Sequence, residues 1–333
     1  MIHLSRCSSV VTRITGRRTP DAGLRHSHRK DTHHHDHHRR PSRPAFEGTL
    51  AAPGAILHYR VAGSGPVLLL SQSGEGDADR TVDLVPHLTD TFTVVTYDRR
   101  GLSRSALDHP TRPVTMADHA DDVALLLTEA ARIRGTARTG VAAPEPALMA
   151  GFSMGAAIGL QVLVRHLGLL GTLVAHEPVL PNLLPPADRD EHVAELLAIQ
   201  NAHAVGGTAA AFPAITRHLG IDPRHDATEE GLTPQPMTPR RRANFDFFIG
   251  TEFTAVTTDG LDPAELAAAA RHSGTRVLPA TGRTTRPDVH THRCALALGE
   301  LLGTEPVAFP GGHNGNTAFP RATARTLKAL LGR

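Results

Sequence analysis

Short apolar runs alternate with amphipathic segments along the chain from about Phe46 onward. The apolar runs fall at residues 57–61, 67–70, 93–97, 146–150, 173–175, 276–280 and 306–309, and each is short enough to be a buried strand. Amphipathic helices are predicted at residues 116–132, 287–302 and 320–331. This alternation predicts an α/β fold, with a doubly wound, mostly parallel central sheet and helices on both faces.

Residues 181–272 break the alternation, because they carry helical patterns without a clear sheet strand. Helices are expected at residues 189–203, 208–219 and 239–254. We interpret the segment as a helical cap inserted into the sheet domain. The cap divides that domain into a first part, residues 46–180, and a second part, residues 273–333.

The first 45 residues have a different composition, rich in Arg and His and poor in apolar side chains. Disorder is expected there, because such a segment cannot bury enough apolar surface to fold. Its clustered histidines are His33, His34, His35, His37 and His38. They indicate either adventitious or regulatory metal binding, or else an extension without a role. The segment itself is interpreted as a genuine part of the protein, a targeting segment or the product of a mis-assigned start.

Charge and composition exclude several classes of function for the rest of the chain. Of 333 residues, 40% are hydrophobic and 20% charged, which suits a large globular domain. The first 45 residues hold ten Lys or Arg against three Asp, so the remainder of this net +2 chain is acidic, at −5, and nucleic-acid binding is not indicated. No apolar stretch is long enough to span a membrane, and two cysteines suit a reducing compartment, so a cytoplasmic location is expected.

The segment 151–155 reads Gly-Phe-Ser-Met-Gly and lies between an apolar run and a stretch of small residues. A strand, a sharp turn and a helix are expected there, with Ser153 at the apex of the turn. Such an elbow exposes the serine Oγ, and its flanking glycines allow strand and helix to approach closely. The N-terminus of the helix then points backbone N–H groups at the reaction centre. Ser153 is therefore the candidate nucleophile.

Two further motifs follow in a familiar order: Tyr-Asp-Arg-Arg-Gly at residues 97–101 and Pro-Gly-Gly-His at residues 310–313. With the elbow, they make residues 48–331 resemble an α/β-hydrolase-fold protein of the serine esterase and lipase-like type. The resemblance implies that His313, on a glycine-rich loop after the last strand, is the catalytic base. A neutral imidazole there accepts the serine proton and returns it to the leaving group.

The acid that orients His313 departs from the family's commonest pattern. Where the family usually has Asp, after the run 276–280, this chain has Gly-Arg-Thr-Thr at residues 282–285. Two carboxylates remain in the chain order serine, acid, histidine: Glu177 and Asp288. We prefer Glu177, because it follows a predicted strand directly, whereas Asp288 also suits a capping position at a helix N-terminus.

The resemblance also implies an oxyanion hole and a substrate cavity. The N–H of Met154 is one expected donor, and either Gly74 or Glu75 supplies the other. Phe245 and Phe248 belong to a cap segment that holds four of the ten phenylalanines, and they are candidates for an apolar acyl pocket. Packing of the cap on the core explains the same cluster equally well.

The sequence thus predicts a serine hydrolase that cleaves a small carboxylic ester through an acyl-enzyme intermediate. Its expected partner is a small-molecule acyl substrate, with no nucleic acid or membrane, and neither a metal nor an organic cofactor is required. The same residues also suit a perhydrolase, a thioesterase, a lactonase or a C–C hydrolase. A non-catalytic binding protein on this fold is the further alternative. The sequence leaves the oligomeric state open.

Overall fold

A computed structural model describes residues 46–135, 145–222 and 226–332. Its sheet has the strand order β1-β2-β4-β3-β6-β7-β8-β9, and β5 pairs with β2 at one side. The strands are β1 (Phe46–Ala52), β2 (Ala55–Gly63), β3 (Val67–Ser71), β4 (Thr93–Tyr97), β5 (Ala106–Leu107), β6 (Ala147–Phe152), β7 (Leu170–His176), β8 (Arg276–Gly282) and β9 (Val307–Phe309). From β4 to β9 neighbouring strands are parallel, whereas β1, β2 and β5 pair antiparallel.

Helices cover both faces of the sheet. They are α1 (Met116–Arg134), α2 (Met154–Arg165), α3 (Pro186–His218), α4 (Pro239–Phe247), α5 (Phe253–Thr257), α6 (Pro263–Ser273), α7 (His290–Leu302), α8 (Gly315–Ala318) and α9 (Pro320–Leu331), with short turns η1 (Ala78–Thr81), η2 (Val85–His87), η3 (Pro181–Leu183) and the π-helical η4 (Phe248–Glu252). Alternate residues of β3 illustrate the two layers. Leu69 belongs to the core beneath α1 and α2, whereas Leu68 and Leu70 belong to the core beneath η2 and α9.

The fold class predicted from the hydrophobic pattern is confirmed. The predicted strands correspond to β2, β3, β4, β6, β7, β8 and β9. β1 and β5 had no counterpart among the expectations, and both pair with β2 at the antiparallel side of the sheet. The expectation of disorder, and that of metal binding by the histidine cluster at 33–38, concern residues outside the described part of the chain.

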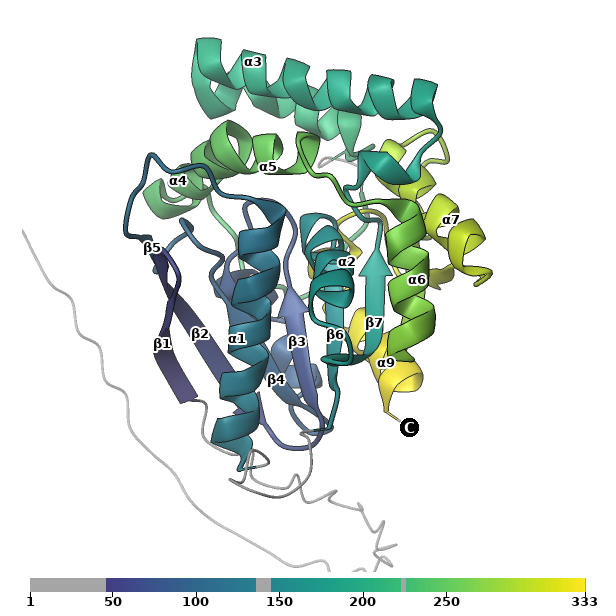
Figure 1. Ribbon diagram of the computed structural model, residues 1–333. Helices are drawn as coiled ribbons and strands as arrows, with labels where there is room; N and C mark the ends of the chain where they lie inside the picture. The colour runs from purple at the N-terminus through teal and green to yellow at the C-terminus, as the bar shows by residue number, and fades with distance from the viewer. Residues whose placement is uncertain (1–45, 136–144, 223–225, 333) are drawn as a thin grey trace, which may run out of the picture. The chain divides into compact units, whose positions relative to one another are not determined.

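The insertion between β7 and β8 carries α3, α4 and α5 beyond the carboxyl ends of the parallel strands (Figure 1). Helix α3 is interrupted at Gly206 and Gly207, where the backbone leaves helical geometry and Gly207 has a φ of 68°. Its two arms, residues 186–205 and 208–218, fold into what we call the cap hairpin. The expected division of this region into two helices matches these arms.

Two details of the insertion differ from the expected helices. The segment 239–254 does not form one regular α-helix, because the π-helical η4 separates α4 from α5. Such π turns are frequent at functional sites. Helix α6 falls inside the proposed cap limits of 181–272, but it packs against α2 and α7 beside the sheet.

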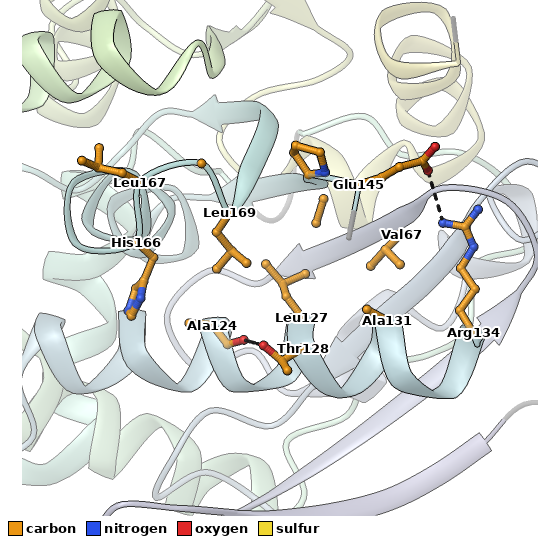
Figure 2. A pocket seen from close by; sticks show the side chains of 13 residues that line it. Val67, Ala124, Leu127, Thr128, Ala131, Arg134, Glu145, His166, Leu167 and Leu169 are labelled. Atoms are coloured by element: carbon orange, nitrogen blue, oxygen red, sulfur yellow. Dashed lines mark hydrogen bonds and ion pairs between the residues drawn. The ribbon is translucent and has the colours of Figure 1, made fainter. Parts of the chain in front are cut away.

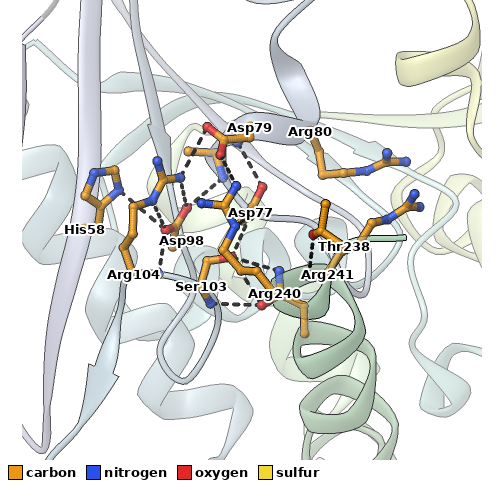
Figure 3. Close-up of polar contacts among 12 residues, drawn as sticks. His58, Asp77, Asp79, Arg80, Asp98, Ser103, Arg104, Thr238, Arg240 and Arg241 are labelled. Atoms are coloured by element: carbon orange, nitrogen blue, oxygen red, sulfur yellow. Dashed lines mark hydrogen bonds and ion pairs between the residues drawn. The ribbon is translucent and has the colours of Figure 1, made fainter. Parts of the chain in front are cut away.

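An ion-pair network fastens α4 to the sheet domain (Figure 3). Asp98, after β4, accepts hydrogen bonds from the Arg104 side chain at 2.7 and 2.9 Å and from the N–H of Ala78 at 2.9 Å. Asp79 then joins Arg60 of β2 to Arg240 of α4, each at 2.6 Å. Asp98 therefore joins the end of β4 to Arg104 and to the start of η1.

Among the described residues, none of the helices has both the length and the apolar character needed to cross a membrane.

Candidate active site

Ser153 stands at the turn between β6 and α2, in a backbone conformation that only strong local constraints maintain. Its φ and ψ are 54° and −116°, a strained combination for a residue with a side chain. The N–H of Ser153 donates to the carbonyl of His176 at 2.8 Å, and its own carbonyl accepts from Ala156 at 3.0 Å. These bonds fix the turn at the carboxyl ends of β6 and β7.

Both glycines of the elbow are required by close packing. A Cβ on Gly151 would overlap the backbone of Gly155, and a Cβ on Gly155 would overlap the carbonyl oxygen of Ser71. The start of α2 therefore lies directly against the end of β3. The expected strand, turn and helix are all present.

His313 follows β9 and is paired with Glu177, which follows β7. The Nδ1–H of His313 donates to Glu177 Oε2 at 2.7 Å. Both side chains are buried, with exposed fractions of 1% and 0%. The Nε2 of His313 is buried and has no hydrogen-bond partner among the described residues. Because Nδ1 is the donor, Nε2 carries the free lone pair of the neutral ring.

Asp288, the alternative candidate for the acid, lies in a different environment. Its carboxylate is exposed and forms a two-point ion pair with Arg286, each contact at 3.0 Å. Helix α7 begins at His290, and no side chain caps it. Of the two candidate carboxylates, the structure brings only Glu177 to His313.

Three groups hold the Glu177 carboxylate. Besides His313, the N–H of Gly282 donates to Oε1 at 2.8 Å, and His292 Nδ1 donates to the same oxygen at 3.3 Å. Burial by itself would raise the pKa of Glu177, but the hydrogen bonds from His292 and His313 outweigh it and lower that pKa below the usual value. Glu177 is therefore ionised at neutral pH.

Helix α7 also contributes to this site, which no sequence pattern predicted. Thr291 Oγ1 lies 3.3 Å from His313 Nδ1, next to the contact between His292 and Glu177. The first turn of α7 thus contacts both the base and the acid. The only sequence signal is the polar run His-Thr-His at 290–292, which follows the other acid candidate.

The loop after β3 (residues 72–76, the β3 loop) faces the elbow and contains Gly74 and Glu75. A buried arginine, Arg99, donates to the carbonyl oxygens of Gln72 at 3.0 Å, Ser73 at 3.1 Å and Gly74. Arg99 also forms a two-point pair with Glu252 of η4, both contacts at 2.9 Å. Because these are charge-assisted bonds in a buried site, they fix the backbone of the loop.

A cavity of about 420 Å³ lies between the cap and the carboxyl ends of the strands. Ser153 and His313 line its floor together with Gly74 and Glu75. Among the described contacts, no hydrogen bond joins Ser153 to the Nε2 of His313. Most of the apolar lining comes from the cap, namely Leu196, Phe212, Ile215, Leu219, Phe245, Phe248 and Phe253. The two phenylalanines expected at the pocket, Phe245 and Phe248, are thus both there.

Another cavity, of about 450 Å³, lies at the opposite end of the strands (Figure 2). Its lining includes Val67 at the start of β3, Ala147 at the start of β6 and Leu127 of α1. Its Arg134 and Glu145 approach each other to 3.8 Å. None of the candidate catalytic residues lines it, so we assign the chemistry to the cavity beneath the cap.

Comparison with known proteins agrees with this geometry. No family model matches the chain. The uncharacterized hydrolase YraK of Bacillus subtilis (strain 168) is 33% identical over 284 residues, which cover 85% of this chain and 95% of that protein. The chain is a hydrolase of the α/β-hydrolase family.

Solved structures of other hydrolases have the same fold. A hydrolase from Pseudomonas aeruginosa PA01 has a TM-score of 0.57 and 25% identity, over 86% of this chain and 98% of its own. An enol-lactonase from Burkholderia xenovorans LB400 has a TM-score of 0.62 and 19% identity, covering 86% of this hydrolase and 100% of the lactonase. A thermophilic esterase from Thermogutta terrifontis has a TM-score of 0.57 and 17% identity, covering 87% and 98%. The family predicted from the motifs is confirmed.

Proposed function

We propose that this hydrolase cleaves a small carboxylic ester, with Ser153 as nucleophile, His313 as base and Glu177 as the acid that orients the base. One observation carries the proposal: a buried His313 donates through Nδ1 to a buried Glu177, while its Nε2 is unpartnered in the cavity region that Ser153 lines. This is the arrangement that activates a serine hydroxyl.

The reaction proceeds in two acyl-transfer steps. His313 Nε2 takes the proton from Ser153 Oγ as the oxygen attacks the substrate carbonyl carbon, and then gives this proton to the departing alcohol oxygen. Water enters, loses a proton to the same Nε2 and attacks the acyl-enzyme, and the proton returns to Ser153 as the carboxylic acid leaves. Glu177 stays ionised and stabilises the imidazolium that forms in each step.

The negative charge on the substrate oxygen is held by backbone N–H groups. We assign the N–H of Met154, the first residue of α2, as one donor, because the positive end of the helix dipole lies there. The second donor comes from Gly74 or Glu75 in the β3 loop. The hydrogen bonds from Arg99 support this assignment, since they keep three carbonyl oxygens of the loop turned toward the guanidinium.

The charges along the cavity favour an ester that itself carries a carboxylate. Arg80 and Arg241 both line the cavity, and they share one carboxylate, Glu75, at 3.3 and 2.8 Å. The three side chains leave one positive charge in surroundings that are otherwise mostly apolar. An anionic group on the substrate would pair with it, while the phenylalanines contact the uncharged part.

A fluorophosphonate probe tests the nucleophile and the base. We expect the full chain to gain the mass of one phosphonyl group, mapped to Ser153, and both Ser153→Ala and His313→Ala to remain unlabelled while they unfold at the wild-type temperature. Labelling at another serine, or none in folded wild-type protein, would favour the non-catalytic binding protein.

A panel of substrates then separates the reactions that share this site. Esters of para-nitrophenol with acetyl, butyryl and succinyl groups are compared with a thioester, a lactone and a C–C substrate, and with peracid formation in the presence of peroxide. We expect the ester that bears a free carboxylate to have the highest kcat/KM. A higher value for any substrate outside the esters would replace the proposed ester specificity and leave the serine mechanism in place.

A further inference from the structure

Four potential metal ligands converge where the cap hairpin meets α7. His192 and Glu195 lie one helical turn apart on the first arm of the hairpin, His218 ends the second arm, and His290 begins α7. One ligand atom from each residue can be chosen so that all four lie within 4.8 Å of one another. Three separate parts of the chain therefore bring their donors to one point.

The burial of these imidazoles requires an explanation. His192, His218 and His290 are 0%, 8% and 5% exposed. Within the described part of the chain, both ring nitrogens of His192 and the Nε2 atoms of the other two rings have no hydrogen-bond partner. Because an unpaired buried polar group is costly, a cluster of four such nitrogens is expected to have a ligand.

The carboxylate already stands between two of the rings. Glu195 Oε2 accepts from His218 Nδ1 at 2.7 Å and from His290 Nδ1 at 3.0 Å. Ligand atoms around a tetrahedral zinc ion lie about 3.3 Å apart, given metal–ligand bonds of about 2.0 Å. The ring of His192 stacks on the other two, with centroids 5.1 and 4.9 Å away. The donors thus lie somewhat farther apart than in a bound site, and the side chains must rotate to direct all four at one ion.

We propose that His192, Glu195, His218 and His290 form a Zn²⁺ site that fastens the cap hairpin to α7. Three imidazoles and one carboxylate suit Zn²⁺, whereas Mg²⁺ and Ca²⁺ prefer sites made of oxygen ligands. Four protein ligands fill the tetrahedral shell, so the ion is structural and leaves no position for substrate.

The position of the site relates it to the cavity. His218 itself lines the cavity beneath the cap. Residue 290 directly precedes Thr291 and His292, which contact the candidate base and acid. An ion at this point would therefore stabilise both the roof of the cavity and the turn that supports the pair of His313 and Glu177.

Zinc binding is measured on the full chain, in a background that removes the five clustered histidines of the N-terminal segment. In this background, His33, His34, His35, His37 and His38 are replaced by Asn. After loading with Zn²⁺ and desalting, we expect about one zinc per chain, a higher unfolding temperature than after chelation, and the visible d–d bands of tetrahedral Co²⁺ when cobalt replaces zinc.

Variants locate the ion. Glu195→Gln keeps the size of a partly exposed side chain. Glu195→Gln and His192→Asn are each expected to weaken zinc binding by about a hundredfold or more. His272→Asn, which alters an exposed histidine on α6, is the matched control and should bind as the background does.

Two results would overturn the site: a folded background protein that retains no zinc, or variants that bind zinc as tightly as the background. If His192→Asn fails to fold, Glu195→Gln alone decides, because its carboxylate is 40% exposed. Binding and unfolding are measured without substrate, so these results are independent of the proposed ester hydrolysis.

Discussion

Replacing Glu177 by Gln tests the acid of the proposed triad with almost no change in shape. The carboxylate accepts from His313, His292 and the N–H of Gly282, and it has no exposed surface. A Gln amide offers one acceptor oxygen and one donor nitrogen in the same space. One of the existing hydrogen bonds must therefore be lost in either orientation of the amide.

Each orientation has a definite consequence. If the amide nitrogen faces His313, Nδ1 must accept, and the ring proton moves to Nε2, which then cannot take the proton of Ser153. If the nitrogen faces the other way, it opposes the N–H of Gly282. Loss of the correct tautomer in serine proteases lowers kcat about 10⁴-fold, which corresponds to about 5.4 kcal/mol of transition-state stabilisation. We expect a loss of this order for Glu177→Gln.

The kinetic constants separate this effect from damage to the cavity. Glu177 does not belong to the cavity lining, so KM for an ester of para-nitrophenol should stay within a few-fold of the wild-type value while kcat falls. The matched control is Asp288→Asn, which alters an exposed carboxylate paired with Arg286. We expect it to leave kcat unchanged and to shift the free energy of unfolding by no more than about 0.5 kcal/mol. Glu177 is not the acid if Glu177→Gln keeps more than a tenth of the wild-type kcat, and a loss of activity in Asp288→Asn would give that role to Asp288.

Three other changes test other parts of the structure. Arg241→Gln should lower kcat/KM for the succinyl ester about tenfold more than for the acetyl ester. Equal losses for both esters would contradict an anion site. Arg242→Gln, at an exposed neighbouring residue, is the control. Glu252→Gln leaves a buried arginine unpaired, so the free energy of unfolding at pH 7 should fall by about 3–5 kcal/mol in urea titrations. Burial would raise the pKa of Glu252, but the charge of Arg99, together with the hydrogen bond from His119, lowers it to about 2, below the usual 4.5. The stabilisation is thus present above about pH 4.5 and is lost as the pH falls toward 2, and a wild-type protein without this loss would disprove the pairing. Gly155→Ala should lower the unfolding temperature by many degrees or prevent folding, because its Cβ would overlap a backbone carbonyl oxygen, whereas Gly260→Ala, which meets open space, should be tolerated in the same thermal scans.

The parts of this fold that the sequence predicted are those with a local physical cause. A buried strand needs a short apolar run, and the β3, β4, β6 and β8 segments each have one. The elbow around Ser153 needs small residues at fixed positions, and the break of the cap hairpin needs the glycine pair at 206–207. In these cases the residues that determine the conformation lie inside the segment that adopts it.

The features that the sequence did not predict depend on partners far along the chain. Arg99 and Glu252 are separated by 153 positions, and neither residue alone indicates that both will be buried. No sequence pattern indicates the π turn of η4. This turn carries both Glu252 and Phe248, which lie where the cap contacts the β3 loop. The histidine cluster could not be predicted for the same reason, because its members come from two helices far apart in the sequence, α3 and α7.

For the acid, the sequence supplied two carboxylates and a preference between them. Strand-end residues are held by the sheet, and Glu177 N–H indeed donates to the carbonyl of Ala280 at 2.9 Å. The hydrogen bond from Gly282 to this carboxylate could not be foreseen, because it depends on the register of β8 against β7. The order of residues along the chain therefore reduced the candidates for the acid to two carboxylates. The pairing of β7 with β8 determines the hydrogen-bond geometry around Glu177.

The first turn of α7 limits how this protein can be recombined with its relatives. Three successive residues, 290 to 292, contact the cap hairpin, His313 and Glu177 in turn. Each residue of an α-helix is rotated by about 100° from the last, so inserting or deleting one residue within this first turn would misdirect the side chains that follow it. A cap grafted from a relative must therefore offer a partner to His290, while Thr291 and His292 keep their places against His313 and Glu177. The register of this turn is the feature to preserve in any chimera.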